Sequence, residues 1–397
     1  MSTILNIAKR ELKLIKSTRS RIILLFIVPL IVYFFIPLIY SNQAIHDTPV
    51  AVFDEDNTEL SRLLTRFLDS SPSLQVVYRA ASFSELNDLI LNNDVKAAFY
   101  FPSGMTKKIK RGKSSNVNIV INSQNIVYGN LIYKAASEIV ITVSSGILLK
   151  KFGAELMPPE KSMNLVMPFR MHKHPLYNPN YDYMQYLAPG LLTVLFQMIL
   201  MFAGASAINT EFDEKLSNGG IRELLQMSNN NIFSIITGKT VAYVVASIFP
   251  ALLILAVVFP SMGISVYGNS ILLFFYLLFF AGVSTVMGLM ISSIFLDKVV
   301  GLDIVFFYNS PAFVFSGFTF PAWALPIYDQ FYSQLIPYTH FIAGFLQLYQ
   351  MDVSLEFVLP HIFALLVFMF IGFFGSYVAM KFHIKKLALI PSLAEGV

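Results

Sequence analysis

Cysteine is absent from the 397-residue sequence, and charged residues are scarce. Without cysteine, the chain cannot be a small secreted scaffold held together by disulfides. Charged residues make up 13% of the chain, about half of the roughly 25% typical of soluble globular proteins. Hydrophobic residues make up 55%, and the mean hydropathy is +0.63. These values exclude a wholly soluble chain and predict an α-helical polytopic membrane protein with a soluble portion.

Several apolar stretches have the length of about 20 residues that a helix needs to cross a hydrocarbon core about 30 Å thick. They are 22–40, 187–208, 241–259, 271–296, 301–320 and 358–380. Residues 41–186, between the first two stretches, are much more polar. The sequence therefore predicts six transmembrane helices with an α/β domain inserted after the first.

Lysine and arginine predict the orientation, because short cytoplasmic loops retain positive charge. Basic residues precede the first span and follow the last, whereas loops 260–270 and 321–357 contain none. Both termini are therefore predicted to be cytoplasmic and the inserted domain extracytoplasmic. The expected parts are a cytoplasmic interfacial helix in 1–21, the first transmembrane helix in 22–40, the extracytoplasmic domain in 41–186, transmembrane helices two to six in 187–380 and a cytoplasmic tail in 381–397.

The N-terminal region has the pattern of an amphipathic helix. One face carries Ile4, Ala8, Leu12 and Ile15, and the opposite face carries Lys9, Lys13 and Lys16. The pattern favours a helix at the cytoplasmic membrane interface over an unfixed basic tail. A cleaved signal peptide is a weaker alternative, because the apolar run exceeds the usual length of about 7–15 residues and 41–44 is a poor cleavage site.

Strand-like runs alternate with helical patterns in residues 41–186, which predicts an α/β layer without giving the strand order. Strands are expected at 50–53, 74–78, 97–101 and 117–121. Asp56 or Asn57 is expected to cap the first helix and Ser82 the second, and a long helix is expected at 127–152. The basic run 107–113 is predicted to be a solvated face rather than a site for lipid headgroups. His172-Lys173-His174 has no third donor nearby, so no metal site is predicted.

The predicted spans lack the groups that self-powered transport requires. Ionisable residues inside a membrane mark ion pathways, but Asp303 and His361 lie near the ends of their spans. Gly238-Lys239-Thr240 resembles the end of a phosphate-binding loop, yet Phe233 stands where the loop's first glycine belongs and no strand precedes it. The chain is therefore predicted to have no catalytic or nucleotide site. Gln197 is mildly polar and Asn309-Ser310-Pro311 is a helix break, and these positions either line a path, let a helix bend or serve packing alone.

Short motifs occur along nearly the whole chain. They are 50–56, Tyr177-Asn178-Pro179, Tyr186-Leu187-Ala188-Pro189-Gly190, Glu211, 220–225, Gly238-Lys239, 316–321, Pro326 and Pro337-Tyr338-Thr339. Together they resemble the membrane subunits of type-2 ABC exporters, in particular bacterial permeases with a large domain between the first two spans. The sequence departs from that family in residues 210–219, which replace an arginine-rich acidic run, and at Asn229, where proline is common.

The resemblance implies an ABC transporter permease in the bacterial inner membrane that moves an amphipathic or hydrophobic substrate out of the cytoplasm or inner leaflet. Separate ABC ATPase subunits at the cytoplasmic face would hold ATP and Mg, with no cofactor bound by this chain. A second permease copy, as homodimer or heterodimer, would complete the path. Membrane lipids and a periplasmic adaptor protein are further candidate partners, and nucleic acid is not one.

The resemblance and the polarity of the spans together indicate site residues. The residues expected to couple the chain to the ATPase are Glu211, Gly220, Arg222, Glu223, Gly238 and Lys239. The residues expected to form the transport path or an outer gate are Gln197, Asn309, Ser310, Ser316, Gly317, Phe318, Phe320, Pro321 and Trp323. The loop from Pro321 to Pro337 is expected to contain short helices. No catalytic or metal-binding residue is expected.

Two other functions fit the composition. A membrane receptor or scaffold that transports nothing would use the inserted α/β domain to bind a ligand or an envelope protein, and it would not associate with an ATPase. A self-sufficient channel or carrier would conduct without nucleotide.

Overall fold

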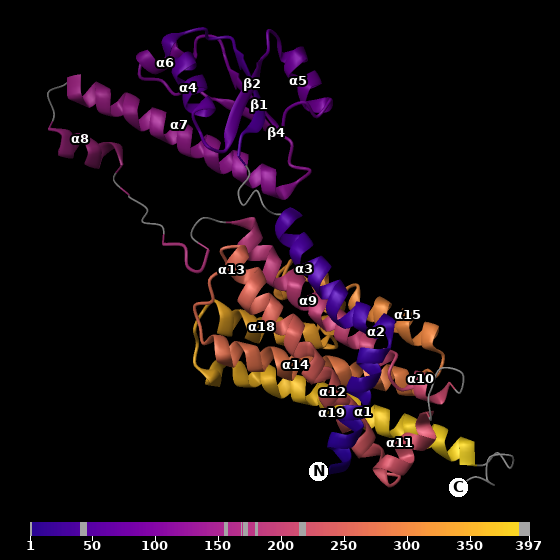
Figure 1. Cartoon of the computed structure of the whole chain (residues 1–397). Coiled ribbons are helices and arrows are strands. Elements are labelled where there is room, and N and C mark those ends of the chain that lie inside the picture. Colours follow the sequence, from indigo (N-terminus) through magenta and orange to yellow (C-terminus); the bar gives the residue numbers. More distant parts are fainter. Residues whose placement is uncertain are drawn as a thin grey trace. The chain divides into compact units, whose positions relative to one another are not determined.

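The computed structural model describes residues 2–39, 46–154, 158–167, 169, 174–178, 182–213 and 220–388. The chain folds as two compact units, a helical unit of Met1–Gln43 with Pro175–Val397, and an α/β unit of Ala44–His174 (Figure 1). The α/β unit lies within the predicted inserted domain, 41–186.

A mixed sheet forms the centre of the α/β unit. Its strands are β1 (Thr48–Asp54), β2 (Leu74–Arg79), β3 (Ala97–Phe101) and β4 (Asn118–Ile121), in the order β2-β1-β3-β4. β1 is parallel to β2 and β3, and β4 is antiparallel to β3. The helices of this unit are α4 (Glu59–Asp69), α5 (Phe83–Leu91), α6 (Met105–Lys110), α7 (Ile126–Ala154) and α8 (Pro159–Val166).

Successive side chains of a strand point to opposite faces of the sheet, and helices cover both faces. Val50 and Val52 of β1 pack in one core with residues of α4 and α7. Ala51, which points the other way, packs in a second core with Leu86 of α5. The long helix predicted at 127–152 is therefore α7, which covers one face of the sheet.

The predicted caps are correct at one helix and wrong at the other. Ser82 caps α5 by accepting a hydrogen bond from the amide of Glu85. Thr58, rather than Asp56 or Asn57, caps α4. The Asp56 carboxylate is occupied by the Thr58 hydroxyl at 2.7 Å, and Asn57 has a φ of 46°, outside the extended conformation of a capping residue.

The helical unit contains the remaining elements. They are α1 (Ser2–Ser17), α2 (Arg19–Ile22), the π-helical turn Ile23–Ile27, α3 (Val28–Ile39), α9 (Tyr183–Ala205), α10 (Asn209–Phe212), α11 (Gly220–Ser228), α12 (Ile232–Leu252), the π-helical turn Leu253–Val258, α13 (Phe259–Ser261), α14 (Ser270–Ile294), α15 (Lys298–Asn309), α16 (Ala312–Phe315), the 3₁₀ turn Ala322–Ala324, α17 (Ile327–Gln334), α18 (Pro337–Tyr349) and α19 (Leu355–Ala388).

Among the described residues, 7 helices are long and apolar enough to cross a membrane. They are Arg19–Ile36, Ile126–Gly153, Tyr183–Phe212, Ile232–Ser261, Ser270–Ile294, Lys298–Phe315 and Leu355–Lys386. Ile126–Gly153 belongs to α7 of the α/β unit, and the others overlap the six predicted spans. The chain is thus a multi-pass helical membrane protein with a small sheet domain.

Helix α14 lies at the centre of the helical unit, where α9, α12, α18 and α19 pack around it (Figure 1). Gly288 of α14 meets Gly204 of α9 so closely that a Cβ on Gly288 would lie 2.4 Å from the carbonyl oxygen of Met201. Small residues permit such close helix crossings in membranes.

The span expected at 301–320 contains the helix break expected at Asn309-Ser310-Pro311. Helix α15 ends at Asn309 and α16 begins at Ala312, because Pro311 has no N–H to donate to the helix. Helix α18 was not predicted, since its 13 residues are too few for a span. Its Phe341 ring stacks on Phe280 of α14, with centroids 3.8 Å apart.

Candidate functional site

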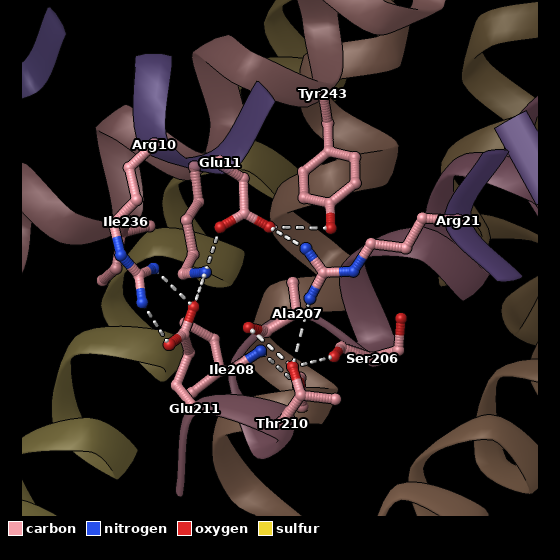
Figure 2. A network of polar contacts seen from close by, with 12 residues as sticks. Arg10, Glu11, Arg21, Ser206, Ala207, Ile208, Thr210, Glu211, Ile236 and Tyr243 are labelled. Atoms are coloured by element: carbon pink, nitrogen blue, oxygen red, sulfur yellow. Dashed lines mark hydrogen bonds and ion pairs between the residues drawn. The ribbon is translucent and has the colours of Figure 1, made fainter. Parts of the chain in front are cut away.

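A network of ion pairs, most of them buried, joins five helices of the helical unit. Figure 2 shows the part of this network around Glu11 and Glu211. Its charged members are Arg10 and Glu11 of α1, Arg21 of α2, Glu211 of α10, Glu223 of α11 and Lys239 of α12. The positive and negative charges balance. These segments are far apart in sequence: Arg10 and Glu223 are separated by 213 positions, and Glu11 and Lys239 by 228.

Lys239 lies at the centre of this ionic network. Its Nζ donates to Oε2 of Glu11 at 2.5 Å and to Oε1 of Glu211 at 2.8 Å. The side chains of Lys239 and Glu11 are fully buried, and that of Glu211 is 3% exposed. Because an unpaired charge away from water is costly, each of these groups needs the others as partners.

Arg10 connects α1 to the two segments that follow span two. Its Nη1 and Nη2 donate to the two carboxylate oxygens of Glu211 at 2.9 and 3.0 Å, and its Nε donates to Glu223 at 2.8 Å. Burial disfavours the charge of Arg10, but its hydrogen bonds to the carboxylates of Glu211 and Glu223, together with their negative charge, outweigh that effect and raise its pKa. Paired donation of this kind fixes orientation as well as distance.

Arg21 and Tyr243 also donate hydrogen bonds to Glu11. Arg21 Nη1 donates to Glu11 Oε1 at 2.7 Å, and the Tyr243 hydroxyl donates to the same oxygen at 3.0 Å. Arg21 Nη2 also donates to the Thr210 hydroxyl at 3.2 Å. The network therefore reaches the start of the first span through Arg21.

A glycine lets α1 approach α12. A Cβ on Gly238 would lie 2.7 Å from the side chain of Ile7, so no other residue fits there without displacing α1. The next residue, Lys239, can then reach Glu11. Gly238-Lys239-Thr240 therefore lies inside a helix, and these residues do not form a phosphate-binding loop.

The structure brings together three of the residues expected to couple the chain to an ATPase, namely Glu211, Glu223 and Lys239. Gly220 is buried where α11 begins, with a φ of 54° that favours glycine. Arg222 is exposed on α11. Gly238 and Lys239 are enclosed within the helical unit rather than exposed on its surface.

Sequence reasoning missed the contribution of Arg10, Glu11, Arg21 and Tyr243. A signal for Glu11 was present, because it is the sole acidic residue in the first 46 positions. It also lies four residues from Ile7 and four from Ile15, on the face of α1 that the structure buries. An acid at the centre of an apolar face indicates a buried cationic partner.

A second cluster brings together three of the sequence motifs, and we term it the aromatic cluster. Phe318 packs so closely on Gly190 of α9 that a Cβ on Gly190 would lie 2.2 Å from the ring. The Tyr186 ring stacks on Phe318, and its hydroxyl donates to the Phe318 carbonyl at 2.7 Å. The Tyr338 hydroxyl donates to the Gly190 carbonyl at 2.6 Å. Gly317, with a φ of 82°, turns the chain into this contact.

The other residues expected at an outer gate differ in their exposure. Ser316 is buried, whereas Phe320 and Trp323 are 48% and 82% exposed. Pro321 precedes the 3₁₀ turn Ala322–Ala324, and α17 follows it. The short helices expected between Pro321 and Pro337 are therefore present.

Two of the expected path residues pair with each other inside the helical unit. Gln197 Nε2 donates to Asn309 Oδ1 at 2.6 Å, which links α9 to α15. Asn309 Nδ2 donates to the Val305 carbonyl at 2.9 Å. Ser310 is exposed and donates to the Phe306 carbonyl of its own helix, so it takes no part in this pair.

No group of three or more His, Cys, Asp or Glu side chains in the described ranges could hold a metal ion. Several positions named in the sequence analysis lie outside those ranges. They are His172, Lys173, Pro179, residues 214–219 and the tail from 389 to 397.

Comparison with known proteins gives matches over most of the chain. Residues 19–378 match the family described as ABC-2 family transporter protein. Over 361 residues, the chain is 24% identical to the probable multidrug ABC transporter permease YbhR of Escherichia coli strain K12. The protein of the same name from Escherichia coli O157:H7 gives the same identity. Each alignment covers 90% of this chain and 93% of the relative.

Proposed function

The chain belongs to the ABC-2 family of transporter proteins, and we propose that it is the permease of an ATP-driven exporter in the bacterial inner membrane. It is a membrane transport subunit rather than a catalytic enzyme. In this proposal, separate ABC ATPase subunits bind at its cytoplasmic face and hold ATP and Mg. A second permease copy completes the path, both termini are cytoplasmic, and an amphipathic or hydrophobic substrate moves outward.

The ionic network is the observation that supports coupling most directly. Helix α11 lies in the segment that the family resemblance assigns to ATPase docking. Glu223 of α11 contacts Arg10, which also contacts Glu211 at the end of the second span. A displacement of α11 would therefore be transmitted to α1 and α10. Through Lys239 and Arg21 it would also reach the third and first spans.

In this proposal the coupling residues have two different roles. Exposed positions on α11, such as Arg222, are available to contact an ATPase. The buried residues Glu211, Gly238 and Lys239 would instead hold the receiving helices in one arrangement. Coupling would then depend on the enclosed ion pairs as much as on the docking surface.

Helix α9 offers a route from the ionic network to a gate. It has 23 residues, which corresponds to a length of about 35 Å. Gly190, near its start, belongs to the aromatic cluster, and Glu211 follows just after its end. A rigid shift of α9 would therefore change both sites together, which is the behaviour required of a helix that couples ATP hydrolysis to gating.

Glu223→Arg tests the coupling role. The substitution places a second cation beside Arg10 and should abolish ATP-dependent export while the protein remains folded, because Glu223 is 43% exposed and tolerates a larger side chain. Export and ATP hydrolysis are measured in vesicles that contain the permease and its copurified ATPase. Asp88→Arg, at an exposed position of α5, is the matched control and should export normally. Full export by the Glu223 variant would show that the coupling role is wrong.

A further inference from the structure

Helix α1 sorts its charged residues between two faces. Arg10 and Glu11 point inward, where their charges are balanced within the ionic network. Lys9, Lys13 and Lys16 are exposed at a spacing of i, i+4 and i+7, which places them in one stripe along the opposite face. Arg19, at the start of α2, is exposed as well. We term these four residues the basic stripe.

The residues of the basic stripe form no ion pair with any residue in the described part of the chain, unlike the inward-facing charges. Like charges at this spacing repel one another. The sequence also supplies no acid to relieve the repulsion locally, because Glu11 is the sole acidic residue before Asp47 and its carboxylate is fully buried. The stripe therefore favours an anionic partner from outside the helix.

The apolar face of α1 is already covered by protein. Ile7 is fully buried, Ile15 is 1% exposed, and both belong to the core of the helical unit. Gly238 of α12 lies directly against Ile7. An amphipathic helix ordinarily binds a membrane by inserting its apolar face, and α1 does not have that face available. Only its charged face remains for contact with a membrane.

The position of the stripe identifies the partner. Arg19 begins the apolar segment Arg19–Ile36, which is long enough to cross a membrane. The lysines of α1 precede that segment directly in the chain. Clusters of basic residues beside a transmembrane helix bind anionic headgroups through charge, and each residue adds to the binding.

We propose that Lys9, Lys13, Lys16 and Arg19 form a binding surface for anionic phospholipid headgroups. The same helix carries Arg10 and Glu11 on its other face, so bound lipid and the ionic network hold α1 from opposite sides. Anionic lipid would thereby stabilise the arrangement of α1 against α12. This lipid site is separate from the proposed coupling to an ATPase and does not depend on it.

The test uses the full-length chain in lipid nanodiscs. Because the chain has no cysteine, Ser17→Cys provides a unique attachment point for a fluorophore beside Lys16. The quenching of this fluorophore by brominated phosphatidylglycerol is compared with its quenching by phosphatidylcholine that has the same brominated acyl chains. We expect phosphatidylglycerol to be preferred by at least about tenfold at low salt, since several basic residues contribute. The preference should shrink at about 1 M salt, where the Debye length is about 3 Å.

The variant Lys9→Gln/Lys13→Gln/Lys16→Gln should lose most of this preference. Glutamine keeps the helix-forming tendency of lysine, so α1 should remain folded. The matched control, Lys107→Gln/Lys108→Gln/Lys110→Gln, makes the same change of charge on the exposed lysines of α6 and should keep the preference.

Equal quenching by the two lipids in the parent chain would overturn the proposal. So would an unchanged preference in the α1 variant. If that variant keeps its lipid preference but no longer copurifies with an ATPase, the basic stripe is a protein-docking surface, and the lipid proposal is wrong.

Discussion

Lys239 is the residue on which the ionic network depends most. Removing its ammonium group leaves the carboxylates of Glu11 and Glu211 buried without their shared cation. Breaking a buried ion pair in this way typically costs about 3–5 kcal/mol. Lys239→Met should therefore lower the free energy of unfolding in detergent by an amount in that range.

The control for this change is Lys385→Met, at an exposed position of α19. An exposed substitution of this kind usually alters stability by no more than about 0.5 kcal/mol. If the two variants have the same unfolding midpoint, Lys239 does not hold the buried carboxylates together.

The sequence indicates which residues of the network are unusual but not which of them meet. Glu11 stands alone as an acid on an apolar face, and Lys239 begins an apolar stretch. Their contact spans 228 positions and depends on the packing of α1 against Gly238. Such a contact depends on the tertiary arrangement of the helices, which cannot be predicted from the periodicity of a single segment.

Gly190 offers a prediction about the aromatic cluster. In Gly190→Ala the added methyl group would overlap the Phe318 ring. Because that ring is the end of a side chain and can move, we expect the protein to fold while ATP-dependent export falls markedly. Adding Phe318→Leu should restore part of the export by making room. The control is Gly146→Ala, where a Cβ meets nothing within 4 Å. Unchanged export in Gly190→Ala would contradict a gating role for the cluster.

At the scale of elements, the crossing of α9 and α14 tests how closely the helices must pack. Gly288→Ala would place its Cβ 2.4 Å from the Met201 carbonyl, a backbone atom that cannot move alone. Overpacking of this kind costs about 1–3 kcal/mol, which should outweigh the gain of about 1 kcal/mol in helix propensity.

Gly282→Ala, on the same helix, is the control for this crossing. Its Cβ would meet the Met369 side chain at 3.4 Å, an ordinary contact. Thermal unfolding in detergent should therefore show Gly288→Ala below the parent chain and Gly282→Ala at or above it. The reverse order would contradict the close crossing.

The turn after β1 contains Glu55 and Asp56, and the hydrogen bonds that these carboxylates accept depend on pH. The Tyr100 hydroxyl donates to Glu55 at 2.5 Å and lowers the pKa of that carboxyl. Burial acts against the charge of Asp56, but hydrogen bonds from Thr106 and Thr58 outweigh it and lower its pKa. Both carboxylates are therefore favoured in the charged form by the folded α/β unit.

A carboxyl group whose pKa is lower in the folded state stabilises the fold at pH values above its unfolded pKa of about 4. This stabilisation is lost as the pH falls through the folded pKa. Hydrogen-exchange protection of β1 and β3, corrected for intrinsic rates, should thus be steady from about pH 7 to 5 and fall below about pH 4. Asp56→Asn should flatten this dependence, whereas Asp88→Asn on α5 should not. Equal curves for both variants would contradict the assignment.

Elements were easiest to predict where one periodic pattern covers a whole helix or strand. The strands near Val50 and Ala97 follow from short β-branched and aromatic runs, and α14 follows from one long apolar stretch. Helix α18 was missed because it is short and its Tyr338 and Phe341 were assigned to a loop rich in aromatic residues. The break at Asn309-Ser310-Pro311 could be predicted from the sequence, because proline cannot donate the backbone hydrogen bond of a helix.

At the scale of the whole molecule, the central claim is that this permease depends on a separate ATPase that binds near α11. The sequence predicts no nucleotide site in this chain, and the structure adds an ionic network that links α11 to the first three spans. The most direct test is to purify the tagged chain from its native membrane and identify what accompanies it. We predict an ABC ATPase that hydrolyses ATP in the purified complex. Recovery of a chain with no nucleotide-binding subunit, yet able to concentrate a substrate across vesicles, would contradict the claim.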